Sequence, residues 1–180
     1  GGSLNLNILN FAFVFMGILL FASPQRYLAT LNDGVRIVAG IIIQYPFYAG
    51  IMAILTGSGL VTSFAQIFVS ISSAETLPIW SFVSGGIINL LAPSGGGQWA
   101  VQGPVMVEAA KSLGASQPAT ALAVQIGDQW TNMVQPFWLL PVLAISGLKL
   151  RDVMGYMVLV LFYLGVIFAS TILLWGFLSA

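Results

Sequence analysis

Residues 89–99, with the sequence NLLAPSGGGQW, interrupt a chain that is otherwise apolar enough to fold inside a lipid bilayer. The interruption holds a proline, three consecutive glycines and several polar side chains. In hydrocarbon every unpaired backbone N–H or C=O group costs several kcal/mol, so non-helical backbone survives only where protein or a water-filled cavity surrounds it. Such breaks mark binding sites in membrane transporters. The sequence therefore predicts a protected break in an all-α integral membrane protein.

The composition supports a membrane protein and excludes several functions. Hydrophobic residues make up 58% of the chain, charged residues only 6%, and the mean hydropathy is +0.99. The formal net charge is zero and there is no basic tract, so no nucleic-acid partner is expected. Because cysteine and histidine are absent, the chain lacks a thiolate nucleophile, an imidazole base and the commonest metal ligand. We expect no enzyme activity, no metal site and no cofactor other than a coupling ion.

Apolar runs along the chain predict a single transmembrane domain over residues 4–180. The expected spans lie near residues 4–22, 37–56, 119–148 and 153–178. Each is close to or above the length of about 20 residues that a helix needs to cross the hydrocarbon core. Residues 60–72 have helical amphipathic spacing but are short, which favours an interfacial helix. Residues 1–3, Gly-Gly-Ser, are interpreted as a linker or tag scar.

The connection to the second span and the span itself each carry a distinguishing feature. Residues 25–36 are the most polar part of the chain and are expected to form a loop or a short surface helix. Within the second span, Pro46 removes a backbone donor and predicts a kink near Gln44 and Tyr45. These three residues could add a ligand contact, although a proline kink alone explains them more simply.

Two segments are predicted to enter the membrane without crossing it as one straight helix. Residues 77–113 divide at the glycine-rich tip into two arms of about 15 residues, each too short to cross alone, and so predict a re-entrant hairpin. The run 119–148 is interrupted at Gln135-Pro136 and again at Pro141, which predicts a broken transmembrane helix.

Basic residues suggest an orientation. If residues 60–72 do not cross the membrane, four of the five basic residues lie on one side and only Lys111 lies on the other. The positive-inside tendency then makes the first side cytoplasmic, with both termini and the mouth of the hairpin outside. If that helix does cross, the division becomes three against two and the signal nearly vanishes.

The tip of the hairpin is predicted to bind a carboxylate. A helix that restarts after the break offers free N–H groups and the positive end of its dipole, and glycines let a ligand approach the backbone. Neither interruption contains lysine or arginine, so backbone dipoles, amides, a bound cation or a proton would neutralise the anion. The alternative is that the glycines only make a tight turn. The candidate substrate-binding residues here are Asn89, Ser94, Gly95, Gly96, Gly97, Gln98 and Trp99.

The broken helix carries a polar stripe, since Gln125, Asp128, Asn132 and Gln135 are spaced by three, four and three residues. Asp128 is the only acidic residue well inside a predicted span, which makes it a functional candidate. It could take and release a coupling proton, or bind sodium together with nearby carbonyl groups. The alternative is a structural carboxylate bonded to a neighbouring helix. The further candidate substrate-binding residues are Gln129, Trp130, Asn132 and Gln135.

Aromatic and charged pairs near the breaks give two smaller expectations. Of the three tryptophans that flank the breaks, Trp99 and Trp130 are better candidates for the walls of a site than Trp138. Glu108 and Lys111 are spaced for an ion pair on the surface of a helix.

Four segments resemble the C-terminal half of the bacterial short-chain fatty acid transporter family, carriers of acetoacetate and butyrate: QYPFYAGI, NLLAPSGGGQWAVQGPV, GDQWTNMVQPFWLLP and LRDVMGY. The resemblance covers nearly the whole chain after residue 3. It implies one inverted-repeat half of a multi-pass secondary transporter in the inner membrane, which moves short-chain monocarboxylates coupled to H⁺ or Na⁺. The implied partner is the N-terminal half or, in a homodimer, a second copy. The alternative is a half-repeat that folds and dimerises without transporting substrate.

Overall fold

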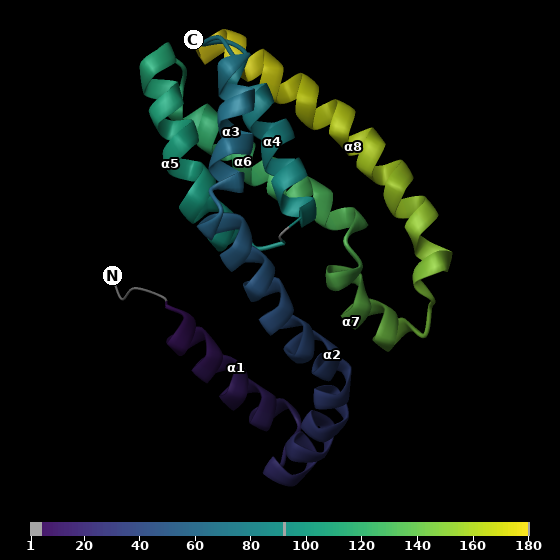
Figure 1. Cartoon of the computed structure of the whole chain (residues 1–180). Coiled ribbons are helices and arrows are strands. Elements are labelled where there is room, and N and C mark those ends of the chain that lie inside the picture. Colours follow the sequence, from purple (N-terminus) through teal and green to yellow (C-terminus); the bar gives the residue numbers. More distant parts are fainter. Residues whose placement is uncertain (1–4, 92, 180) are drawn as a thin grey trace. The chain divides into compact units, whose positions relative to one another are not determined.

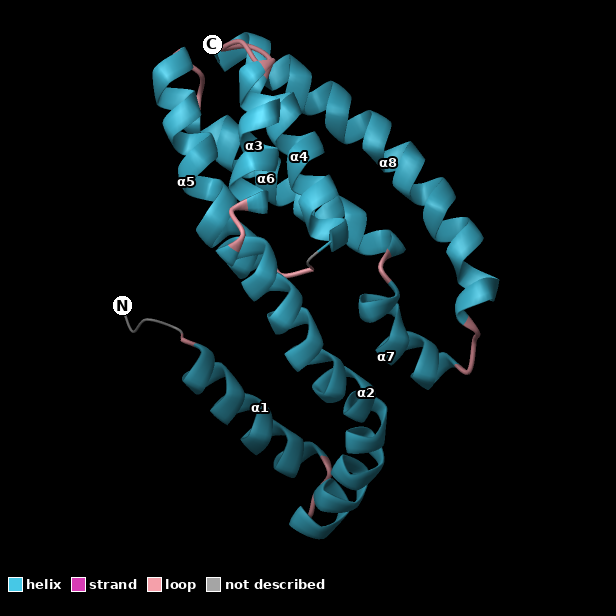
Figure 2. Cartoon of the chain, in the orientation of Figure 1, coloured by secondary structure: helices cyan, strands magenta, loops and turns pink. Residues whose placement is uncertain are grey.

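The computed structural model describes residues 5–91 and 93–179, and this part of the chain is helical, without a strand (Figures 1 and 2). The tag scar expected at residues 1–3 lies outside the described residues. The chain divides into two compact units, Gly1–Ile43 and Gln44–Ala180. The all-helical fold expected from the sequence is confirmed.

Unit 1 consists of α1 (Leu6–Leu20) and the first part of α2 (Pro24–Gly57). A short turn bends the chain by 116° between α1 and the segment Pro24–Arg36. Residues 25–36 are therefore neither a loop nor a separate surface helix, because they continue into the apolar part of α2 without a break. The helix α2 begins at Pro24, because the fixed backbone angle of proline suits the first position of a helix.

Unit 2 contains the rest of α2 and the remaining elements. In chain order these are α3 (Leu60–Ser70), α4 (Leu77–Leu91), α5 (Gly95–Leu113), α6 (Gln117–Thr131), the 3-10 helix η1 (Asn132–Val134), α7 (Pro136–Ser146) and α8 (Leu150–Ser179). The helices α4 and α6 form the central pair, and α8 packs against both (Figure 1). One apolar cluster joins α3, α4, α5 and α6, and a second joins α4, α6 and α8.

Glycines bring α4 and α6 close together. A Cβ atom on Gly85 would lie 2.7 Å from the carbonyl oxygen of Val124, and a Cβ atom on Gly127 would overlap the carbonyl oxygen of Phe82. Lipid and protein interiors are equally apolar, so helix association in a membrane depends on such close packing of small residues. The glycines therefore fix the distance between the two helices that carry the breaks.

Within residues 5–91 and 93–179, two helices are long and apolar enough to cross a membrane, Val38–Gly57 and Leu150–Ser179, or three if the bent pair in unit 1 counts as one. The run 119–148 is divided into α6 and α7, which join at η1 and Gln135. The second interruption expected at Pro141 does not occur, because α7 continues through that residue. A single proline removes one helical hydrogen bond without ending a helix when neighbours compensate.

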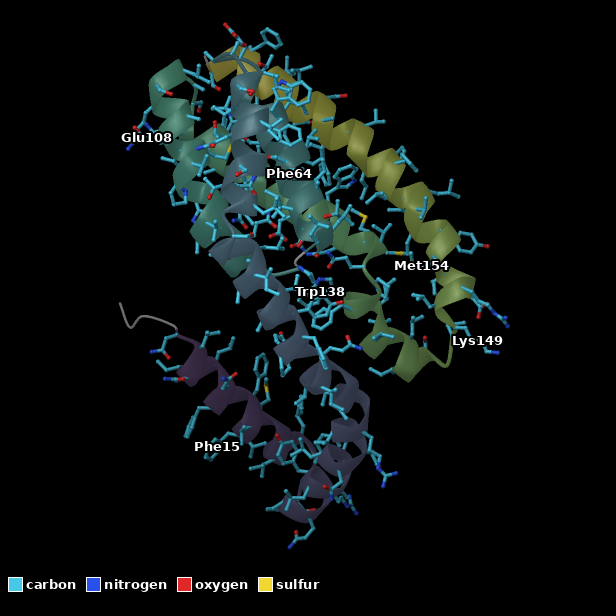
Figure 3. All side chains as sticks on the ribbon, in the orientation of Figure 1. Phe15, Phe64, Glu108, Trp138, Lys149 and Met154 are labelled. Atoms are coloured by element: carbon cyan, nitrogen blue, oxygen red, sulfur yellow. The ribbon has the colours of Figure 1, made fainter. Side chains whose placement is uncertain are left out.

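Charged side chains lie at the ends of unit 2. Figure 3 shows Glu108 near the end of α5 and Lys149 just before α8, far from each other. The ion pair expected between Glu108 and Lys111 is confirmed at 3.6 Å, with both side chains exposed. This distribution leaves the middle of unit 2 to apolar and uncharged polar side chains, with Asp128 as the exception.

The close crossing of α4 and α6 yields a stability prediction. Gly127→Ala should lower the free energy of unfolding by about 1–3 kcal/mol, because the added methyl group overlaps the backbone of α4. The control is Gly155→Ala, which has no atom within 4 Å of the new Cβ and should be neutral or stabilising by up to about 1 kcal/mol. Reversible unfolding in detergent measures both values, and equal values would contradict the packing described here.

Candidate functional site

Two helix breaks lie next to each other in unit 2, one between α4 and α5 and the other between α6 and α7. The side chain of Asn89, in the last turn of α4, joins them. Its Nδ2 donates to the backbone oxygen of Asp128 at 2.7 Å, to Oδ1 of Asn132 at 2.9 Å and to Oγ1 of Thr131 at 3.0 Å. One fully buried amide thus holds the end of one helix against the end of another.

Further hydrogen bonds cross between the breaks. The hydroxyl of Thr131 donates to the backbone oxygen of Gly86 at 3.0 Å, and Nε2 of Gln135 donates to the backbone oxygen of Asn89. Helix ends leave carbonyl groups without partners inside the helix, and burying them unpaired is costly. The polar side chains at one break therefore satisfy backbone groups at the other.

The breaks lie about halfway along the long helix α8. The indole Nε1 of Trp130, at the end of α6, donates to the backbone oxygen of Leu161 at 2.8 Å. Leu161 lies near the middle of α8, which has 30 residues and is therefore about 45 Å long. Near the C-terminal end of α8, a Cβ atom on Gly176 would overlap the backbone oxygen of Glu75, which lies just before α4. If α8 crosses a bilayer, the breaks lie near the middle of that bilayer.

The first turn of α5 presents its backbone N–H groups at the break. Ser94 precedes the helix, but its side chain makes no capping hydrogen bond. The first intrahelical bond is donated by Gln98 to the oxygen of Ser94 at 2.7 Å. The N–H groups of Gly95, Gly96 and Gly97 have no hydrogen-bond acceptor among the described residues. These groups and the helix dipole favour a negative charge at this point.

The carboxylate of Asp128 faces this helix start. A Cβ atom built on Gly95 would lie 3.2 Å from Oδ2 of Asp128, so the absence of a side chain at Gly95 makes room for the carboxylate. Asp128 is only 5% exposed, and its Oδ2 has no hydrogen-bond partner among the described residues. No lysine or arginine forms an ion pair with it in that part of the chain. A charged Asp128 would thus rely on the α5 dipole and on a further positive species.

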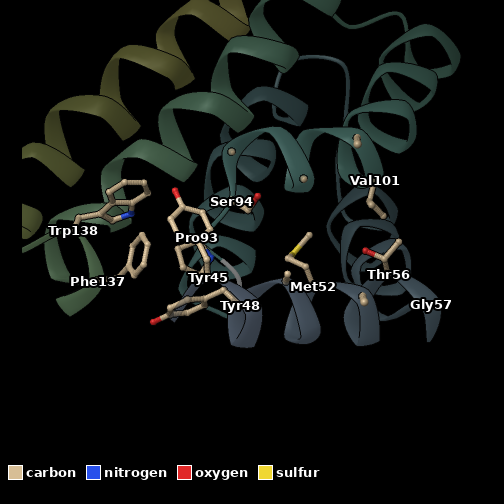
Figure 4. A pocket seen from close by; sticks show the side chains of 15 residues that line it. Tyr45, Tyr48, Met52, Thr56, Gly57, Pro93, Ser94, Val101, Phe137 and Trp138 are labelled. Atoms are coloured by element: carbon tan, nitrogen blue, oxygen red, sulfur yellow. The ribbon is translucent and has the colours of Figure 1, made fainter. Parts of the chain in front are cut away.

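Two pockets open on either side of the tip. The larger, of about 840 Å³, is mainly apolar and lies between α2, the first turns of α5 and the start of α7 (Figure 4). The smaller, of about 390 Å³, is lined by polar side chains of α6, among them Asp128. Pro93, Gly95 and Trp138 line both. The arrangement offers polar contacts on one side of the tip and an apolar surface on the other.

The candidate residues from the sequence divide into two groups. Ser94, Gly95 and Gly97 line the larger pocket, while Asp128, Gln129 and Asn132 line the smaller one. Gly96 is exposed and has no atom within 4 Å of a Cβ position, so close packing at the tip involves Gly95 and Gly97 instead. The remaining candidates, Asn89, Gln98, Trp99, Trp130 and Gln135, line neither pocket.

Several of these remaining residues have structural contacts. The Nε2 group of Gln98 donates to Gly85 and Gln102, each at 2.9 Å, so its donors do not face a pocket. Trp99 packs over Gly103, where its ring leaves no room for a Cβ atom. Trp130 lies 4.9 Å from the ring of Phe82. Trp138 lines both pockets, whereas Trp99 and Trp130, the wall candidates from the sequence, line neither.

The polar stripe expected on one helical face is not continuous. The helix α6 ends at Thr131, so Asn132 belongs to η1 and Gln135 is the residue that precedes α7. Gln125 is exposed, whereas Gln135 is buried between the breaks. The spacing rule fails here because it assumes that one helix runs through all four positions.

The sequence marked Tyr45 as a possible ligand contact, but the rest of the aromatic wall on α2 and α7 was not predicted. Phe137 lies at the centre of this wall, with ring centroids 5.7 Å from Tyr45, 5.0 Å from Tyr48 and 4.9 Å from Trp138. Met52 and Thr56 continue the wall along α2 (Figure 4). A signal was present, because residues 45, 48, 52 and 56 recur at helical spacing on one face of α2.

Comparison with known proteins gives a consistent result. Residues 1–175 match the family model described as short chain fatty acid transporter. Two curated relatives carry the name "Putative short-chain fatty acid transporter": one from Escherichia coli, 42% identical, and one from Haemophilus influenzae, 40% identical, each over 168 residues. Both alignments cover 93% of this chain and 38% of the relative, so the chain spans well under half of each relative. No solved structure matches.

The amide of Asn89 provides a test of the junction between the breaks. Asn89→Leu should lower the free energy of unfolding by about 2–4 kcal/mol, because it removes three hydrogen bonds, including the one to the buried backbone oxygen of Asp128. Asn10→Leu, at an exposed position of α1, is the control and should change stability by no more than about 0.5 kcal/mol. A small effect at both positions in a detergent unfolding titration would show that the breaks do not depend on Asn89.

Proposed function

We propose that this chain, which belongs to the short chain fatty acid transporter family, forms the carboxylate-binding part of a secondary transporter for short-chain monocarboxylates such as acetoacetate and butyrate. The family is one of transporters and not of enzymes. The proposal rests chiefly on one observation, the uncapped start of α5 at a helix break that opens onto two pockets. We propose that the bacterial inner membrane is the site of transport.

The substrate carboxylate would bind at the N–H groups of Gly95, Gly96 and Gly97. Helix starts bind anions because their N–H groups point outward and the dipole is positive there. The short apolar tail would then contact the aromatic wall of the larger pocket, formed by Phe137, Trp138 and the tyrosines of α2. A pocket without lysine or arginine suits a single carboxylate better than a dicarboxylate.

The position of Asp128 gives a physical reason why substrate binding would be coupled to the binding of an ion. A substrate carboxylate at the start of α5 would lie close to the Asp128 carboxylate, and two like charges repel strongly in a medium of low dielectric constant. A proton or a sodium ion at Asp128 removes this repulsion. Substrate binding would therefore require the coupling ion, and Asp128 is the residue we propose to hold it.

The proposed topology assumes that α8 crosses the membrane, so that positions along α8 give the depth of the neighbouring elements. Both breaks lie near the middle of this helix, where secondary transporters bind substrate between interrupted helices. We propose that α4 and α5 form a re-entrant hairpin entering from the outer side, and that α6 and α7 form one broken span of an inverted-repeat half. The side with Lys149 and Arg151 would be cytoplasmic.

The exposed polar side chains of α6 need a cover at membrane depth. Gln125 and Gln129 are exposed in this chain and line the smaller pocket. Polar groups facing lipid cost free energy, so we propose that a second repeat half or a second copy of the chain packs over them. Such a partner would close the smaller pocket.

Uptake of radiolabelled butyrate into proteoliposomes tests the proposal. The chain should give saturable uptake, and Gly95→Val should weaken binding by about tenfold or more, because the branched side chain would occupy the space between the α5 start and Asp128. Gly50→Val is the control, since no atom lies within 4 Å of its Cβ position and it lines neither pocket.

Two outcomes would contradict the proposal. Wild-type affinity in the Gly95 variant would reduce the tip to a turn without contact to substrate. Folded chains that bind no butyrate and give no uptake would support a half-repeat that assembles without transporting.

A further inference from the structure

Four buried oxygen atoms at the two helix breaks have no hydrogen-bond donor among the described residues. They are Oδ1 of Asn89, Oε1 of Gln98, Oδ2 of Asp128 and Oε1 of Gln135. Each of these side chains is at most 6% exposed. Buried polar atoms are almost always paired in proteins, so four unpaired acceptors in one region require an explanation.

The orientation of the three amides is fixed by their donors. The Nδ2 group of Asn89 faces three oxygen acceptors, Nε2 of Gln98 faces two, and Nε2 of Gln135 faces the backbone oxygen of Asn89. Rotating any of these amides by 180° would place oxygen against oxygen. The amide oxygens therefore point away from these bonds.

Hydrogen bonds join three of these residues, Asn89, Asp128 and Gln135, and Gln98 lies one helical turn from the point where Gly95 meets Asp128. Asn89 and Gln98 flank the break between α4 and α5, whereas Asp128 and Gln135 flank the break between α6 and α7. Asn89 bonds to the backbone of Asp128, and Gln135 bonds to the backbone of Asn89. Asp128 in turn lies beside Gly95, one helical turn before Gln98.

We propose that this junction binds a sodium ion, held by the carboxylate of Asp128 and by amide oxygens of Asn89, Gln98 and Gln135. Hard cations take oxygen ligands from carboxylates and from amide carbonyl groups. A proton on Asp128 would neutralise the carboxylate but supply only one donor, which leaves the amide oxygens unpaired. A cation can contact several of these oxygens at once.

The charge and size of the ion follow from the ligands. No cluster of three or more acidic, histidine or cysteine side chains exists in the described part of the chain, so Asp128 supplies a single negative charge. A monovalent cation gives a neutral site, while a divalent one would leave a net charge in a membrane interior. The small number of oxygen ligands suits a small cation such as sodium better than potassium.

A sodium ion, and not a proton, at this junction goes beyond the proposed function. Only the role of this ion in coupled transport rests on that function. Sodium at Asp128 would lie beside the start of α5, where it would offset the negative charge of a bound carboxylate. The order of binding would be sodium first, since the ion removes the repulsion that a carboxylate would otherwise meet.

Thermal unfolding of the purified chain in detergent tests the site without any substrate. At a constant ionic strength of about 0.1 M, NaCl should raise the Tm by at least about 2 °C relative to choline chloride, because an ion that binds only the folded chain stabilises it. KCl should give a smaller rise. Equal Tm values in NaCl and choline chloride, or equal rises in NaCl and KCl, would overturn the sodium assignment.

Two variants and their controls locate the effect. Asp128→Asn and Gln135→Met should each lose the sodium-dependent rise, and the second keeps the test valid if the first fails to fold. The controls Asp33→Asn and Gln117→Met change exposed residues and should keep it. A full sodium response in either folded variant would place the ion elsewhere. Adding butyrate separately distinguishes the two proposals, because a chain with the sodium response but no butyrate binding would retain the cation site and lose the proposed function.

Discussion

The side-chain amide of Asn89 makes three hydrogen bonds to the end of α6 and the turn that follows it. Unpaired backbone groups are costly in hydrocarbon, and two helix breaks at one level would expose many of them. The two breaks solve this problem jointly, because side chains of one satisfy carbonyl groups of the other. The open start of α5 and the position of Asp128 both depend on this junction.

The junction in turn requires the close approach of α4 and α6. Gly85 and Gly127 lie where the backbones meet, and a side chain at either position would force the helices apart. Greater separation would move Asn89 out of hydrogen-bonding range of Asp128. Glycines remote from the ligand pockets thus set the geometry at the site, while Gly95 leaves the space that the Asp128 carboxylate occupies.

Part of this arrangement could be predicted from the sequence. The proline and glycines after Asn89 predicted the end of one helix, and Pro136 predicted the start of another, because both residue types act on the local backbone. Pro141 was misinterpreted, since a single lost hydrogen bond does not end a helix. The role of Gln98 could not be predicted, because spacing along the chain does not reveal that its donors face Gly85 and Gln102.

We propose that a monocarboxylate binds where the two breaks meet. Anomalous diffraction from a crystal grown with a brominated butyrate measures this position directly. We expect a bromine peak in the pocket bounded by the start of α5, Met52 and the aromatic wall of Phe137 and Trp138. A peak at another location, with no ligand density at the start of α5, would contradict it.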